Sequence, residues 1–134
     1  IILAAGTFTG AKLNRFLLLK NISPKILVNG STLGAFAASF FVWLLIDYGI
    51  YFLIPYFFIV MAFSMAIPNI LSTALIHYKN ETGSAGALLG LIYYVLIGLG
   101  LVSSGWIQNL GISCMIFSGI GVLALFIQLK RKAV

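Results

Sequence analysis

The sequence predicts an all-α integral membrane protein that contains the end of one helix followed by four transmembrane helices. Four long apolar stretches carry this prediction, and they span residues 26–46, 49–76, 84–107 and 110–129. Each can cross the roughly 30 Å hydrocarbon core of a bilayer as a helix, which takes about 20 residues. The composition agrees, because 62% of the 134 residues are hydrophobic and only 7% are charged, whereas soluble domains carry about 25% charged residues.

Residues 1–11 precede these stretches and are also mostly apolar. A signal peptide would place positive charge first, then an apolar core, and then a cleavage site of small residues, and here that order is reversed. We therefore expect residues 1–11 to be the last turns of a helix that begins upstream of Ile1. On this interpretation the sequence is a fragment, or the ordered part, of a longer membrane protein.

The basic residues fall in alternate links between the stretches. Four of them lie in residues 12–25, one lies in 77–83 and three lie in 130–134, whereas the links at 47–48 and 108–109 contain none. Basic residues are retained on the cytoplasmic side of a membrane. We therefore expect residues 12–25, 77–83 and 130–134 to be cytoplasmic.

Glycine and proline residues predict how the helices pack and bend. Gly30 and Gly34 lie four residues apart in the first long stretch, and Gly86 and Gly90 do so in the third. Such spacing puts small residues on one helix face and lets backbones approach closely in lipid, so these four glycines are predicted helix-packing positions. The second stretch contains two prolines, at positions 55 and 68, and each is expected to bend its helix.

The sequence offers little chemistry for an enzyme. Both acidic residues, Asp47 and Glu81, lie in links, and the single cysteine, Cys114, has no partner for an internal disulfide. We find no catalytic triad pattern, phosphate-binding glycine loop or metal-spaced histidine cluster, so no enzyme, metal, cofactor or nucleic-acid partner is expected. Proton coupling requires a titratable group within the membrane, so a proton-coupled parent would carry its carboxylate outside this sequence.

A few polar side chains within the stretches are candidates for a substrate cavity. Asn69 follows Pro68, and a buried amide needs hydrogen-bond partners, so its role is either a structural hydrogen bond or a contact with the cavity. Tyr93 and Tyr94 lie in the middle of the third stretch, where core packing competes with ligand contact. We predict Met65, Asn69, Tyr93 and Tyr94 as the cavity-facing residues.

Two segments carry a resemblance to a known family. Residues 66–75 read Ala-Ile-Pro-Asn-Ile-Leu-Ser-Thr-Ala-Leu, and residues 82–90 read Thr-Gly-Ser-Ala-Gly-Ala-Leu-Leu-Gly. They resemble the region of the tenth and eleventh helices in bacterial drug:proton antiporters of the bicyclomycin/chloramphenicol-resistance (Bcr/CflA-like) type, which belong to the major facilitator superfamily. Residues 10–15 and 129–132 resemble the basic link after helix eight and the basic end of the same proteins.

The resemblance implies a specific architecture and function. Residues 1–11 would be the end of helix eight, and the four stretches would be helices nine to twelve, in the C-terminal six-helix half of a twelve-helix transporter. It implies proton-driven efflux of drugs or small metabolites by alternating access in a bacterial inner membrane. The partners would be the lipid bilayer, the missing N-terminal helices and a small-molecule substrate. The fragment alone is not expected to transport.

Arg15 is the candidate for a latch on the cytoplasmic side. The superfamily's basic loop carries an Asp-Arg pattern, which reads Asn14–Arg15 here. The alternative is that its charge only sets orientation. For the whole chain, the alternatives to the transporter are a non-transporting membrane subunit and a small four-helix transporter that works as an oligomer.

Overall fold

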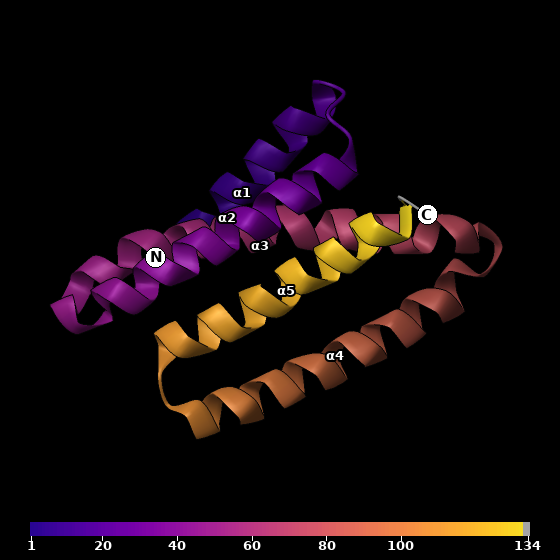
Figure 1. Ribbon diagram of the computed structural model, residues 1–134. Coiled ribbons are helices and arrows are strands. Elements are labelled where there is room, and N and C mark those ends of the chain that lie inside the picture. The colour runs from indigo at the N-terminus through magenta and orange to yellow at the C-terminus, as the bar shows by residue number, and fades with distance from the viewer. Residues whose placement is uncertain (133–134) are drawn as a thin grey trace.

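The computed structural model describes residues 1–132, with all side chains in that range except those of residues 77, 79, 80, 82, 131 and 132. Every element in this part of the chain is helical (Figure 1). The α-helices are α1 (Ile2–Leu19), α2 (Pro24–Leu45), α3 (Leu53–Leu75), α4 (Thr82–Ile107) and α5 (Leu110–Lys132), and the 3₁₀ helices are η1 (Ile46–Phe52) and η2 (Ile76–Glu81). The predicted all-α fold class is confirmed.

Several of these helices are compatible with a membrane-spanning protein. Three helical stretches are long and apolar enough to cross a bilayer, namely Pro24–Leu75, Gly83–Ile107 and Leu110–Lys130. The first of them folds back on itself at η1 and so comprises α2 and α3. The structure thus contains three to four candidate spans, and their assignment to one half of a major facilitator protein stays a prediction.

The predicted boundary of the first helix is wrong. Residues 12–25 were expected to form a link, but α1 continues to Leu19. The helix ends in a Schellman motif, in which Asn21 adopts a left-handed φ of 60° and the Ile22 amide donates to the Leu17 carbonyl at 3.2 Å. Asparagine tolerates this conformation, so the helix stops there and only about four residues connect α1 to α2.

α2 begins two residues earlier than predicted because of a local capping signal. The Ser23 hydroxyl accepts a hydrogen bond from the Ile26 amide, and Pro24 occupies the first helical position. Proline suits that position because its missing N–H would have no helical partner there. Ser-Pro before an apolar run is therefore a start signal.

The hairpin between α2 and α3 depends on Gly49. Its φ of 70° and ψ of −124° belong to a region that side-chain-bearing residues avoid. α3 then starts at Leu53, which places Pro55 in its first turn. Proline in a first turn removes no intrahelical hydrogen bond, so the predicted cause of a bend at Pro55 is absent and the bend itself stays a prediction. Pro68 does lie inside α3.

A tight turn joins α4 to α5. Gln108 adopts a left-handed φ of 50°, and its amide donates to the Ser104 carbonyl at 3.0 Å. Asn109 then caps α5, because its Oδ1 accepts a hydrogen bond from the Ile112 amide at 3.1 Å. The predicted link at 108–109 is thus where the chain reverses (Figure 1).

α2 is the central helix of the packed part of the molecule. It packs against α3 and against α5, while α1 packs against α3. The buried core lies between α2 and α3, where Val42 is fully buried beside Ala38 and Ile59. α4 runs along the outside (Figure 1), and none of its described side chains is buried.

The closest helix contacts are made by glycines other than the predicted ones. A Cβ placed on Gly10 of α1 would lie 2.5 Å from the Met61 carbonyl oxygen of α3, and one on Gly111 of α5 would lie 2.7 Å from Trp43 Cα of α2. By contrast, a Cβ on any of the four predicted packing glycines would meet no atom within 4 Å; these are Gly30, Gly34, Gly86 and Gly90. No close contact in the described structure uses those four positions, and their packing role stays a prediction.

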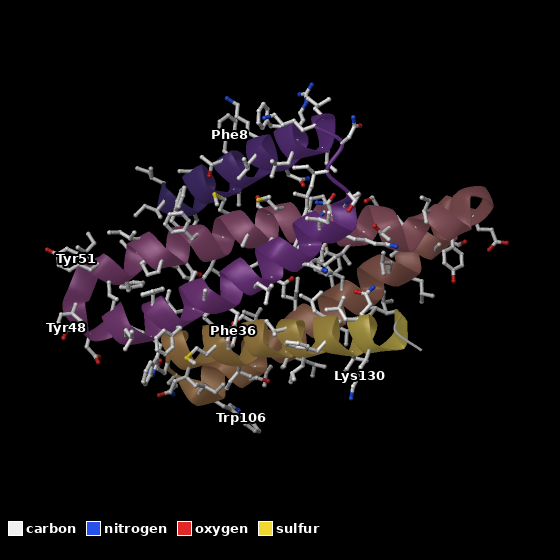
Figure 2. The ribbon with its side chains drawn as sticks, turned by 45° about the horizontal axis from the view of Figure 1, so that its top comes forward. Phe8, Phe36, Tyr48, Tyr51, Trp106 and Lys130 are labelled. Atoms are coloured by element: carbon white, nitrogen blue, oxygen red, sulfur yellow. The ribbon has the colours of Figure 1, made fainter. Side chains whose placement is uncertain are left out.

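The two ends of the bundle differ in character. Asn14 of α1 contacts Asn69 of α3, and Lys25 of α2 shares a pocket with Leu129 of α5, so the basic links lie at one end. Gly111 contacts Trp43, which brings the turn at 108–109 to the end where η1 lies. Figure 2 shows Tyr48 and Tyr51 at the end opposite Lys130. The geometry therefore matches the predicted alternation of links, although it does not assign either end to a compartment. Residues 133–134 of the predicted cytoplasmic tail lie outside the described structure.

Candidate functional site

A pocket with a volume of about 510 Å³ lies between α2, α3 and α5 at the basic end of the bundle. Most of its wall is apolar, but six lining residues are polar or charged. They are Lys25, Asn29 and Thr32 from α2, Asn69 and Thr73 from α3, and Gln128 from α5. We call this site the polar pocket, and it is the candidate functional site because it gathers polar side chains from three apolar helices.

The α2 side of the polar pocket follows from helical spacing. Lys25 and Asn29 are four residues apart and Thr32 follows three residues later, so all three lie on one face. The Thr32 hydroxyl donates to the Val28 carbonyl of its own helix at 2.8 Å. Asn29 is half-buried, and within the described part of the chain its amide has no hydrogen-bond partner. Lys25 and Asn29 are therefore the groups of α2 that a ligand could engage.

Asn69 links the polar pocket to α1. Its Nδ2 donates to Asn14 Oδ1 at 2.6 Å and to the Met65 carbonyl at 2.8 Å, and both asparagines are buried. Asn69 therefore makes the structural hydrogen bond that the sequence analysis gave as one of its two roles, because its amino group donates to protein partners. Its Oδ1 receives no hydrogen bond from the described residues, so it is the part of Asn69 left for a ligand.

α5 completes the pocket with one amide and an apolar wall. Gln128 is exposed, and within the described structure its side chain makes no hydrogen bond. Leu125 and Leu129 line the same side, and Ile70 of α3 faces them across the pocket. Among the side chains that the structure describes, the pocket lining contains no acid, histidine or cysteine. The amide and ammonium groups of this lining can hold a solute by hydrogen bonds.

The four predicted cavity residues do not meet in one site. Met65 lines a separate apolar groove of about 610 Å³ between α2 and α3, which Gly30 and Gly34 also line. Tyr93 and Tyr94 lie on α4, where they are 39% and 73% exposed and their rings pack edge to face at 5.9 Å. Of the four, only Asn69 lines the polar pocket.

Arg15 lies on the exposed side of α1 rather than in a loop. It follows the buried Asn14 and makes no ion pair within the described structure. On the same helix, Lys12 sits over the ring of Phe8 with Nζ 4.9 Å from its centroid, and Lys20 sits over Phe16 at 4.6 Å. The latch role of Arg15 stays a prediction.

The sequence pattern did not identify Asn14 as the partner of Asn69, nor the polar residues of α2 and α5 that line the pocket. Asn14 was placed in a link, so its pairing with a span residue was not considered. Ser23 and Pro24 mark the start of α2, and the four-residue spacing of Lys25 and Asn29 then places both on one helix face. This signal could have identified them as a pair. Gln128 carries no signal of its own, because only the packing of α5 against α2 brings it to the pocket.

The described residues include no group of three or more histidine, cysteine, aspartate or glutamate side chains that could hold a metal ion. Comparisons of the chain with models of known protein families, with curated proteins and with solved structures found no match. The resemblance to drug:proton antiporters therefore has no support from these comparisons and stays a prediction.

Proposed function

We propose that the chain is part of a secondary transporter of the major facilitator type, which exports drugs or small metabolites in exchange for protons. The polar pocket carries this proposal. Asn69 is buried and Asn29 is half-buried among apolar helices, a placement that costs free energy, and polar residues placed at membrane depth are usually functional. The pocket adds four further polar or charged side chains to these two asparagines, from three helices in all, and is therefore best explained as a place where a solute is held.

The open surfaces of the molecule support the same proposal. α4 has no buried side chain among those described, and the groove beside Gly30 and Gly34 is open. In an alternating-access transporter the two halves close around a central site and rock against each other. We propose that helices outside this sequence cover α4 and the groove, and that these helices carry the coupling carboxylate.

The transport test uses the complete reading frame that contains this chain. Everted membrane vesicles from cells expressing it would be energised, and the proton gradient would be followed by acridine orange fluorescence while amphipathic antibiotics are added. We expect at least one compound to release protons, and we expect Asn29→Ala to reduce that release at least about ten-fold through lost binding. Absence of any proton release in vesicles that contain the folded protein would contradict the proposal.

A non-transporting membrane subunit is the second candidate, and the exposure of α4 favours it. Such a subunit would hold a larger complex together through that helix, and its polar pocket would not take part. Substituting Leu91 and Leu96 of α4, which are both 61% exposed, by tryptophan would then disrupt a stable complex on native gel electrophoresis while Asn29→Ala would not. A small oligomeric transporter would instead show this chain as homo-oligomers by native mass spectrometry.

A further inference from the structure

The described lining of the polar pocket carries positive charge and no negative charge. Of the side chains that the structure describes, Lys25 is the one charged group in its lining, and neither Asp47 nor Glu81 belongs to it. Lys20 caps the end of α1 and Lys130 lies in the last turn of α5, so both lie at the basic end of the bundle, outside the lining. An ammonium group without a carboxylate partner favours an anionic ligand. The pocket is thus unsuited to a cationic drug, which would face Lys25 directly.

The other polar groups can complete the recognition of an anion. Asn29 is one helical turn from Lys25 and has a free amide, and Gln128 offers a second amide from α5. Each amide carries two N–H donors. The first turn of α2 also borders the pocket, since Pro24 lines it. The partial positive charge at the start of a helix adds to the same preference.

The remaining wall of the pocket is apolar and suits contact with a hydrocarbon chain. It is formed by Ile70 of α3 and by Ala124, Leu125 and Leu129 of α5. Lys25 is the second residue of α2, so the charged group lies at the helix end, while Ile70 and Leu125 lie further inside α3 and α5. A ligand that fits both parts has a charged head and an apolar tail.

We infer that the polar pocket binds an anionic amphiphile, with its phosphate or carboxylate head at Lys25 and Asn29 and its tail between Ile70 and Leu125. The same chemistry is found in an anionic membrane lipid and in a soluble amphipathic anion. This inference rests on the proposed function, because it names the ligand class of the proposed substrate site.

Binding is tested on the purified product of the complete reading frame in neutral detergent, without transport. Dodecyl phosphate and dodecyltrimethylammonium share a tail and differ in head charge, so their affinities isolate the effect of charge. We expect dodecyl phosphate to bind at least about ten-fold more tightly, as a charge-assisted contact requires. Lys25→Gln should remove this preference, and Asn29→Ala should weaken dodecyl phosphate binding while the circular dichroism of the helices stays unchanged.

The matched controls are Lys20→Gln and Lys130→Gln, which remove the same charge at the same end but outside the pocket. They should leave dodecyl phosphate affinity within about two-fold, because neither ammonium group lines the pocket and solvent screens a charge beyond a Debye length of about 8 Å. Equal losses in all three lysine variants would overturn the inference, since they would mean attraction by the whole basic surface. Equal affinity for the two detergents would overturn it as well.

A second experiment distinguishes a membrane lipid from a soluble anion as the ligand. Nanodiscs of phosphatidylglycerol or of phosphatidylcholine would be disassembled for native mass spectrometry, with and without dodecyl phosphate. Phosphatidylglycerol that is retained by the native chain, lost in Lys25→Gln and displaced by dodecyl phosphate supports a lipid in this pocket. Binding of dodecyl phosphate without retained phosphatidylglycerol supports a soluble anion. Anion binding without proton exchange would contradict the proposed transporter function but not this inference. Proton exchange that occurs with cationic compounds and not with anionic ones would contradict this inference but not the transporter function.

Discussion

Single residues decide how closely α1 and α3 approach each other. Gly6, Gly10 and Asn14 recur every four residues along α1 and are its buried positions. The glycines let the backbones touch, and the Ser64 hydroxyl of α3 donates across the contact to the Thr7 carbonyl at 2.9 Å. Small residues and interhelical hydrogen bonds are the features that hold helices together in lipid, where hydrophobic burial gives no advantage.

Gly10→Ala is expected to destabilise the protein by about 1–3 kcal/mol, as overpacking does. The added methyl would lie 2.5 Å from the Met61 carbonyl oxygen and 2.6 Å from Ser64 Oγ, so one helix must move. Thermal unfolding in detergent, followed by tryptophan fluorescence, measures the loss. Gly86→Ala is the control, because a Cβ there meets no atom within 4 Å. Equal midpoints for the two variants would contradict the close approach.

The hydrogen bond between Asn14 and Asn69 is expected to appear as a coupling energy. Both side chains are buried, so replacing either one by alanine leaves the other short of a partner. We expect a double-mutant cycle of Asn14→Ala and Asn69→Ala to give about 0.5–2 kcal/mol, the range found between membrane helices. The cycle of Thr9→Ala with Asn69→Ala should be additive, because Thr9 bonds only within α1. A coupling near zero for the asparagine pair would refute the contact.

Whole elements are delimited here by short polar signals rather than by the lengths of the apolar stretches. Asn21, Ser23 and Asn109 each stop or start a helix through hydrogen bonds to backbone groups. The hydropathy pattern is insensitive to such signals, because a helix can continue through a basic segment as long as its backbone bonds are satisfied. This is why α1 extends eight residues past the predicted end at residue 11.

Gly49→Ala is expected to weaken the hairpin of α2 and α3 by about 1–3 kcal/mol, the cost of holding a side-chain-bearing residue in a sparsely populated backbone region. Its φ of 70° and ψ of −124° require glycine, although no neighbouring atom lies within 4 Å of the added Cβ. Gly98→Ala, which also meets no atom but lies within α4, should leave stability unchanged or raise it. Unfolding in mild denaturant compares the two, and the reverse order would contradict the turn geometry.

The whole molecule has two chemically different ends, and this asymmetry predicts its placement in a membrane. The basic links gather at one end, while η1 and the turn at 108–109 lie at the other, where Tyr48 is 71% exposed and Trp106 is 87% exposed. Aromatic side chains of this kind favour the membrane interface. We propose that the basic end faces the cytoplasm.

Cysteine labelling tests this placement on the whole chain. In a Cys114→Ala background, single cysteines would replace Lys20, Lys130, Tyr48 and Gln108, which are all exposed. A membrane-impermeant maleimide should label the first two only in inverted vesicles and the last two only in spheroplasts. Labelling of Lys20→Cys and Lys130→Cys from opposite sides would contradict the shared basic end. Labelling of all four in the reverse pattern would contradict the cytoplasmic assignment alone.

The sequence by itself determined the fold class, the four apolar helices and the alternation of links with and without basic residues. These properties depend on composition and on order along the chain, because apolar length decides which segments can span a bilayer and basic residues decide which links stay on the cytoplasmic side. It also singled out Asn69, because an amide in an apolar helix needs partners wherever the helix packs.

The tertiary structure alone decided which residues meet. It paired Asn69 with Asn14, separated Asn69 from the two tyrosines of α4, and joined Lys25, Asn29 and Gln128 in one pocket. It also showed that Gly10 and Gly111 make the close contacts while the predicted glycines are open. In lipid, apolar side chains gain little by choosing one neighbour over another. The helix faces that pack are therefore set by shape and by a few hydrogen bonds between distant segments, and periodicity along one helix does not encode them.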